Sequence, residues 1–203
     1  MGPFPHDAPP ATISERNPAG TDGFEFVEFA HSEPAKLEEL FARMGYTAVA
    51  KHRTKNITVW RQGDINYLVN AEPGSHAMKF VDLHGPCASS MAWRVVDARH
   101  AFDHAVSKGA TPYTGSDKAL DVPAIVGIGG SLIYFIDRYG AKGSAYDAEF
   151  DWIGSRDPKP EGVGFYYLDH LTHNVYRGNM DKWWDFYRDL FGFTQIHYFD
   201  IDG

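Results

Sequence analysis

One histidine in this sequence has a setting that suits metal chemistry. His170 follows Asp169 in the segment FYYLDHLTHNVY, whose apolar and aromatic residues are typical of a strand. Neutral imidazole is the commonest side-chain metal ligand. A lone histidine on a strand is nevertheless more often a surface or hydrogen-bonded residue. The residue type alone therefore leaves both interpretations open.

The alternation of side chains along a strand limits which neighbours can share a site with His170. In a regular strand, His170 and Thr172 lie on one face, and His173 lies on the other. The two histidines therefore cannot bind one metal. If His170 faces a barrel interior, Thr172 is a pocket-lining candidate, and His173 is structural or exposed.

A second pair of histidines has the spacing of a helical zinc site. His100 and His104 stand four residues apart, which places both on one face of a helix. They lie opposite the apolar residues Phe102 and Val106. We therefore interpret them as a solvated surface pair.

Two other motifs are better explained by structure than by chemistry. The glycines of VGIGGS (126–131) are followed by SLIYFID, which reads as a strand, whereas a dinucleotide site requires a helix there. We predict a hairpin turn. Cys87 has no accompanying base that would make it a nucleophile, and the sequence contains neither a Gly-x-Ser-x-Gly motif nor a P-loop.

The elements that must position these residues form a repeated unit. A strand over 23–30 is followed by a helix for which Ser32 is the predicted N-cap, Pro34 lies in the first turn and Gly45 ends the helix. Three strands follow, YTAVAKHR, NITVWRQG and INYLVNA. The first unit is thus β-α-β-β-β.

Two further copies follow the first. The second opens with a strand over 89–97, continues with a helix ending at Gly109, and finishes with short strands up to SLIYFIDRYG. The third opens at FYYLDHLTHNVY, has Asn179 as the predicted N-cap of its helix, and begins another strand at FTQIHYFDIDG. That third module is incomplete.

The copies predict four regions in the chain. We expect a flexible leader over 1–19, a domain of two modules over 20–139, a Pro/Gly-rich linker over 140–162 and the start of another domain over 163–203. A lone fragment of sheet leaves an uncovered edge and face. The third module therefore predicts a longer protein, or completion by another chain.

Composition and charge argue against several classes of partner and location. Hydrophobic residues make up 43% and charged residues 23% of the 203 residues, as in globular proteins. The net charge of -8 and the absence of a Lys/Arg run disfavour nucleic acid and anionic membranes as partners. Cys87 is the only cysteine, which favours a reducing cytoplasm. No apolar run approaches membrane-spanning length.

The modules and motifs together resemble a known family. Paired β-α-β-β-β modules resemble the vicinal oxygen chelate superfamily, an α+β fold. Within it the sequence is similar to the 4-hydroxyphenylpyruvate dioxygenase family. The resemblance rests on NPAGTDGFEFVEFA, MAWRVVDARHAFDHAVSKGA, LIYFIDRYG, FYRDLFGF, YFDIDG and, most specifically, LDHLTHNVYRG.

The resemblance implies that the two domains differ in metal binding. The first domain would be free of metal, and the second would hold Fe(II) on two histidines and one carboxylate, with His170 as the first ligand. No residue of this chain is assigned to the other two roles. The implied enzyme is an Fe(II)-dependent 2-oxoacid dioxygenase of tyrosine catabolism, which converts 4-hydroxyphenylpyruvate and O₂ to homogentisate and CO₂. The resemblance further implies that this chain alone is inactive and that the complete enzyme is a homo-oligomer.

The corresponding positions of the first two modules fit a domain without metal. Alignment of the opening strands places Glu28 and Ser90 at the equivalent positions, and neither is a histidine. We expect Glu28 to be an inward carboxylate with hydrogen-bond partners. Two alternatives remain open: hydroxymandelate synthase, a relative with the same iron and substrate, and a non-catalytic binding protein of the same fold.

Overall fold

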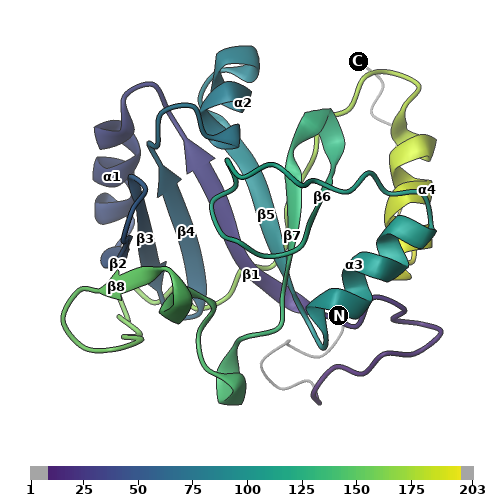
Figure 1. Cartoon of the computed structure of the whole chain (residues 1–203), viewed down its shortest axis with the longest axis horizontal. Coiled ribbons are helices and arrows are strands. Elements are labelled where there is room, and N and C mark those ends of the chain that lie inside the picture. The colour runs from purple at the N-terminus through teal and green to yellow at the C-terminus, as the bar shows by residue number, and fades with distance from the viewer. Residues whose placement is uncertain (1–8, 198–203) are drawn as a thin grey trace.

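A computed structural model describes residues 9–197 as a strongly curved sheet with helices on its outer face (Figure 1). No helix within this range is long and apolar enough to cross a membrane. In chain order the helices and strands are β1 (Thr21–Ala30), α1 (Pro34–Arg43), β2 (Thr47–His52), β3 (Ile57–Gln62), β4 (Ile65–Asn70), α2 (His76–His84), β5 (Cys87–Val95), α3 (Ala98–Ser107), β6 (Ala124–Val126), β7 (Leu132–Ile136), β8 (Phe150–Trp152) and α4 (Met180–Phe191).

The sheet confirms the α+β class and the first β-α-β-β-β module. Its eight strands run in the order β6-β7-β5-β1-β4-β3-β2-β8. The first strand of each module pairs in parallel with the last strand of the same module, β1 with β4 and β5 with β7. β1 and β5 pair antiparallel at the centre. The two modules are thus related across the β1–β5 pair.

The second module has one regular strand fewer than expected. It contains β5, α3, β6 and β7, and only an isolated bridge between Pro112 and Ile125 stands where a further strand was predicted. Helix α2 joins the modules and was not predicted. It begins where Ser75 Oγ accepts a hydrogen bond from the Met78 amide, and it buries Ala77 against Ala30 of β1.

Two layers of apolar side chains cover the faces of the sheet. The concave face holds the main core, with rings such as Phe26, Tyr134 and Tyr146 fully buried. On the convex face, α1 covers one end of the sheet and α3 covers the other, with α4 beside α3 (Figure 1). Small residues on one side of α3, including Ala101 and Ala105, allow that helix to approach the sheet closely.

The helix starts agree with the sequence only in part. Ser32 is not the N-cap of α1: Glu33 occupies that position without a capping side-chain bond, and Pro34 is the first helical residue. The ring of Pro34 fixes φ at a value that suits the first helical turn, and Pro34 has no N–H that needs a hydrogen-bond partner. Proline at this position therefore favours the helix start even though no side chain caps it. Asn179 does stand at the N-cap of α4, also without a side-chain bond.

The first half of the expected linker is part of the folded sheet. Within 140–162, β8 pairs antiparallel with β2 and extends that edge. The short 3-10 turn η4 (Ala145–Ala148) precedes it, and Tyr146 and Phe150 are buried in the main core. The prediction followed the high Gly, Asp and Pro content and overlooked these two aromatic residues, which supply the burial that orders the segment.

The second half of the expected leader also has defined contacts. Asn17 accepts hydrogen bonds from the backbone and hydroxyl of Thr21 and donates one to the Thr21 carbonyl. Ala19 is fully buried beside α3. The side chain of Asn17 thus joins the last residues of the expected leader to the start of β1. Residues 1–8 lie outside the described part of the chain.

The third module lacks the predicted opening strand. Residues 163–178 form no strand in the described structure, whereas α4 follows as expected and ends at Gly192, a left-handed residue with φ 71°. A strand needs neighbouring strands for its backbone hydrogen bonds, and this segment has none among the described residues. Residues 193–197 form no strand either, and 198–203 lie outside the described residues.

Candidate functional site

His170 lies on the surface with one ring nitrogen engaged by its neighbour. Its side chain is 73% exposed, and Nδ1 lies 2.7 Å from Oδ2 of Asp169. When Nδ1 carries the proton and donates it to this carboxylate, the lone pair remains on Nε2. A carboxylate holding one imidazole nitrogen in this way fixes the tautomer that binds metal through the other.

Two leucines place the Asp169–His170 pair against the convex face of the sheet. Leu168 packs on the cluster formed by α1 and β4, which includes Phe41. Leu171 packs on the cluster around Trp93 of β5. The two polar residues between these leucines are left exposed.

A cavity of about 530 Å³ adjoins His170. Its walls come from the outer face of β1 and β5, from the segment around His170 and from α4. The aromatic residues among them are Phe24, Trp93, Trp183, Trp184, Tyr187 and Phe193. Such a cavity suits a flat apolar group, and Asp169 and His170 are among its polar lining residues.

Thr172 and His173 take different positions beside this cavity. His173 lines it together with His170, and burial lowers the pKa of His173. Thr172 lines the neighbouring groove instead, which runs past α2 and β5. The alternation argument does not apply here, because the segment is not a regular strand.

The described residues provide one candidate metal ligand, not a complete site. No group of three or more His, Cys, Asp or Glu side chains with metal-binding geometry occurs among residues 9–197. His170 fits a ligand role through its exposure and its oriented ring. The other ligands that a two-histidine, one-carboxylate site requires are not brought to it by this part of the chain.

The equivalent positions of the first two modules lie side by side on the concave face. Glu28 and Ser90 are register partners across the β1–β5 pair, as the module alignment predicted. Glu28 is 1% exposed, its Oε1 accepts a hydrogen bond of 2.7 Å from Asn70 Nδ2, and burial raises its pKa. Oε2 has no hydrogen-bond partner in the described structure. The prediction of an inward, hydrogen-bonded carboxylate is confirmed for one oxygen.

The remaining sequence candidates have structural roles. His100 Nε2 lies 2.9 Å from the Pro18 carbonyl, and His104 is half-buried where α3 meets α4, so only His100 is a surface residue. Residues 127–131 connect the antiparallel strands β6 and β7 as the predicted hairpin. Burial raises the pKa of the Cys87 thiol, which disfavours a nucleophilic role.

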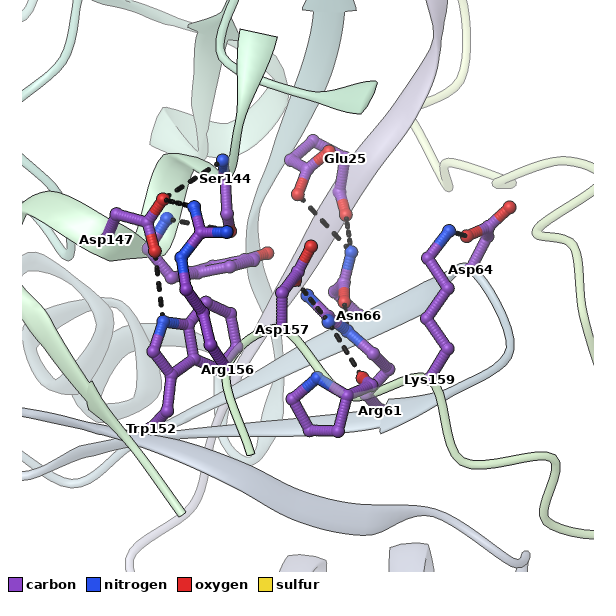
Figure 2. A network of polar contacts seen from close by, with 12 residues as sticks. Glu25, Arg61, Asp64, Asn66, Ser144, Asp147, Trp152, Arg156, Asp157 and Lys159 are labelled. Carbon is purple, nitrogen blue, oxygen red and sulfur yellow. Dashed lines mark hydrogen bonds and ion pairs between the residues drawn. The ribbon is translucent and has the colours of Figure 1, made fainter. Parts of the chain in front are cut away.

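One polar network escaped the sequence analysis. Glu25 and Arg61 are each 4% exposed on the concave face. Asn66 connects them: it accepts from Arg61 Nε at 2.6 Å and donates to the Glu25 carbonyl at 2.8 Å (Figure 2). Arg94 Nε lies 2.6 Å from Glu25 Oε2. The sequence does place charged residues at inward positions of these strands. Which of them pair depends on the register between strands, which the sequence does not show.

Comparison with known proteins identifies the class and then the family. The fold and the paired modules are those of a vicinal oxygen chelate protein. Residues 15–151 match the family model described as hydroxyphenylpyruvate dioxygenase, HPPD, N-terminal. The chain therefore belongs to the hydroxyphenylpyruvate dioxygenase family.

Individual relatives match most of the chain. The chain is 46% identical to 4-hydroxyphenylpyruvate dioxygenase of Pseudomonas aeruginosa over 95% of its own length and 55% of the relative's. It is 50% identical to a Vibrio vulnificus protein named hemolysin VllY, over 92% of this chain and 54% of that one. A solved fusion of a xylose isomerase-like TIM barrel and 4-hydroxyphenylpyruvate dioxygenase matches with a TM-score of 0.78 and 33% identity, covering 92% of this chain and 29% of that one. The chain spans about half the length of the curated relatives it matches.

Proposed function

We propose that this chain is part of a 4-hydroxyphenylpyruvate dioxygenase, which converts 4-hydroxyphenylpyruvate and O₂ to homogentisate and CO₂. The observation that carries the proposal is the family match over 15–151. It is joined by a histidine, His170, whose ring is oriented for metal binding at the place where the family resemblance expects the first ligand.

His170 is proposed as one ligand of an Fe(II) ion. The role of this chain's residues is to present the ligand: Asp169 holds the proton on Nδ1, and Nε2 keeps its lone pair for the metal. The chemistry that iron supplies when bound is electron transfer to dioxygen and coordination of the 2-oxoacid. The two remaining ligands would come from residues other than those described.

Substrate, partners and location follow from the same proposal. The aromatic cavity beside His170 is compatible with a phenyl ring, and Thr172 stays a pocket-lining candidate from the neighbouring groove. We propose an aromatic 2-oxoacid and O₂ as the small-molecule partners. From the family resemblance we expect a homo-oligomer, and the single cysteine favours the cytoplasm as its location.

Product analysis tests the proposed reaction. The native protein, reconstituted with Fe(II) under anaerobic conditions and then given 4-hydroxyphenylpyruvate and O₂, should yield homogentisate and one CO₂ per substrate. Hydroxymandelate as the product would replace the proposal by the related synthase. No consumption of substrate by iron-loaded protein would favour the non-catalytic binding protein.

A further inference from the structure

The turn between β3 and β4 forms hydrogen bonds to the segment that leads to His170. Gln62, the last residue of β3, is fully buried. Its Oε1 accepts hydrogen bonds from the backbone amides of Val163, at 2.6 Å, and Phe165, at 3.2 Å. Its Nε2 donates to the Met44 carbonyl at 2.9 Å, which fixes the amide group from the other side. One side chain thus connects the end of α1, the sheet and the incoming segment.

The two residues after Gln62 extend this contact through the backbone. The Gly63 amide donates to the Pro160 carbonyl at 2.8 Å, and the Asp64 amide donates to the Tyr166 carbonyl at 3.2 Å. Gly63 has φ 56°, and a Cβ there would lie 2.6 Å from Cα of Tyr166. The turn and the segment are therefore too close to accommodate any side chain at position 63.

Ion pairs secure the chain just before this contact. Arg61 Nη1 lies 2.7 Å from Oδ1 of Asp157, and Lys159 Nζ lies 2.5 Å from Oδ1 of Asp64 (Figure 2). The Arg61 side chain is only 5% exposed, whereas Lys159 is 62% exposed. We therefore assign the stronger fixation to Arg61, because exposed ion pairs contribute little.

The fixed stretch ends close to the candidate metal ligand. Tyr166 is four residues before His170, and Leu168, between them, packs on the cluster of α1 and β4. The backbone that leads to His170 is thus held by hydrogen bonds at 163, 165 and 166, and by the packing of Leu168. The same cluster contains Tyr46, which lies just beyond the Met44 carbonyl that Gln62 also holds.

We propose that Gln62 is a positioning residue for the metal site: through the Gln62–Asp64 turn, the domain without metal sets the placement of the His170 ligand. This inference rests on the proposed function of His170. Ligands must be held within about 0.5 Å of the productive geometry. Loss of an outer contact that orients a ligand typically weakens metal binding by about 10–100-fold. Because Gln62 acts through the backbone, we expect the lower end, about 10-fold.

Substitution of Gln62 by methionine tests the inference. Methionine has a similar length and apolar stem but neither donates to Met44 nor accepts strongly from Val163. We expect Q62M in the native protein to bind Fe(II) about 10-fold more weakly in anaerobic titration. Amide hydrogen exchange of the metal-free protein should accelerate at 163 and 165. V59A is the matched control, because Val59 is a fully buried residue of the same strand, and its side chain has no polar atom that could hold the segment by a hydrogen bond.

A second pair of variants guards against a folding defect in Q62M. G63A and G74A both place alanine at a positive φ, but nothing lies within 4 Å of a Cβ at Gly74, whereas Tyr166 obstructs one at Gly63. Weaker iron binding in Q62M and G63A, with V59A and G74A at the wild-type affinity, supports the proposal. Wild-type affinity in both Q62M and G63A, or equal loss in the controls, would overturn it. A wild type that binds no Fe(II) would instead overturn the proposed function, and this inference with it.

Discussion

Phe150 tests whether residues 140–152 belong to the folded domain. Its side chain is 1% exposed at the start of β8 and contacts two rings, with centroids 4.9 Å from His52 and 5.5 Å from Tyr146. The perturbation is Phe150→Ala. It removes a fully buried ring from the edge of the main core while leaving the backbone pairing of β8 with β2 available.

The expected cost follows from burial. Truncation of a buried phenylalanine to alanine removes its transfer free energy and leaves a cavity, which together destabilise by about 3–5 kcal/mol. For a protein of this size, each kcal/mol lowers Tm by about 2–4 °C. The variant should therefore unfold roughly 6–20 °C below the wild type.

Thermal and urea unfolding provide the assay, with Ile153→Ala as the matched control. Ile153 follows β8 directly but is 45% exposed, so its truncation should change the free energy of unfolding by about 0.5 kcal/mol or less. A Phe150→Ala variant that unfolds within 1 °C of the wild type would refute the reasoning. The segment would then be a linker, as its composition first indicated.

Three further predictions concern single side chains. Burial raises the pKa of Glu28 above its ordinary 4.5, so the folded protein binds the carboxyl proton more tightly than the unfolded chain does. The stability that this proton contributes is present below pH 4.5 and is lost as pH rises through the folded pKa. Glu28→Gln should therefore gain stability relative to the wild type above pH 4.5, by at most about 1.4 kcal/mol per pH unit, and a pH-independent difference in urea titrations would contradict this. Arg53 donates to the carbonyls of Ala148 and Phe150 at 2.6 and 3.0 Å, and Arg53→Met should cost about 1–2 kcal/mol of unfolding free energy, whereas an unchanged urea midpoint would show that these bonds contribute nothing. The Cys87 thiol, whose pKa burial raises, should react with iodoacetamide at neutral pH more slowly than a free cysteine peptide and reach the peptide rate only in urea; equal rates in the folded protein would show that the thiol is unprotected.

The sequence predicted the regular elements that carry their own periodicity. The first module, α3 and α4 show alternating or helical patterns with glycines at their ends, and each appears in the structure. Helix α2 was missed because its nine residues were read as part of the connection between modules. β8 was missed because three residues in a Gly- and Pro-rich stretch show no period; its order comes from contacts with β2, which lies about a hundred residues earlier.

The candidate site was predictable in residue identity but not in surroundings. The resemblance of LDHLTHNVYRG to the family pointed to His170, and alignment of the opening strands of the first two modules pointed to Glu28 and Ser90. The Asp169–His170 contact and the separation of Thr172 from the cavity depend on the backbone of an irregular segment. The hydrogen bond from the Val163 amide to Gln62 joins residues 101 positions apart, and no local pattern in the sequence indicates it.

Iron binding by the native protein tests the central claim most directly. Anaerobic Fe(II) titration of the wild type, His170→Ala and His173→Ala, with circular dichroism to verify the fold, compares two histidines three residues apart. We predict one Fe(II) per chain in the wild type and in His173→Ala, and loss of that binding in a folded His170→Ala protein. Wild-type iron content in His170→Ala would contradict the assignment of His170 as a ligand.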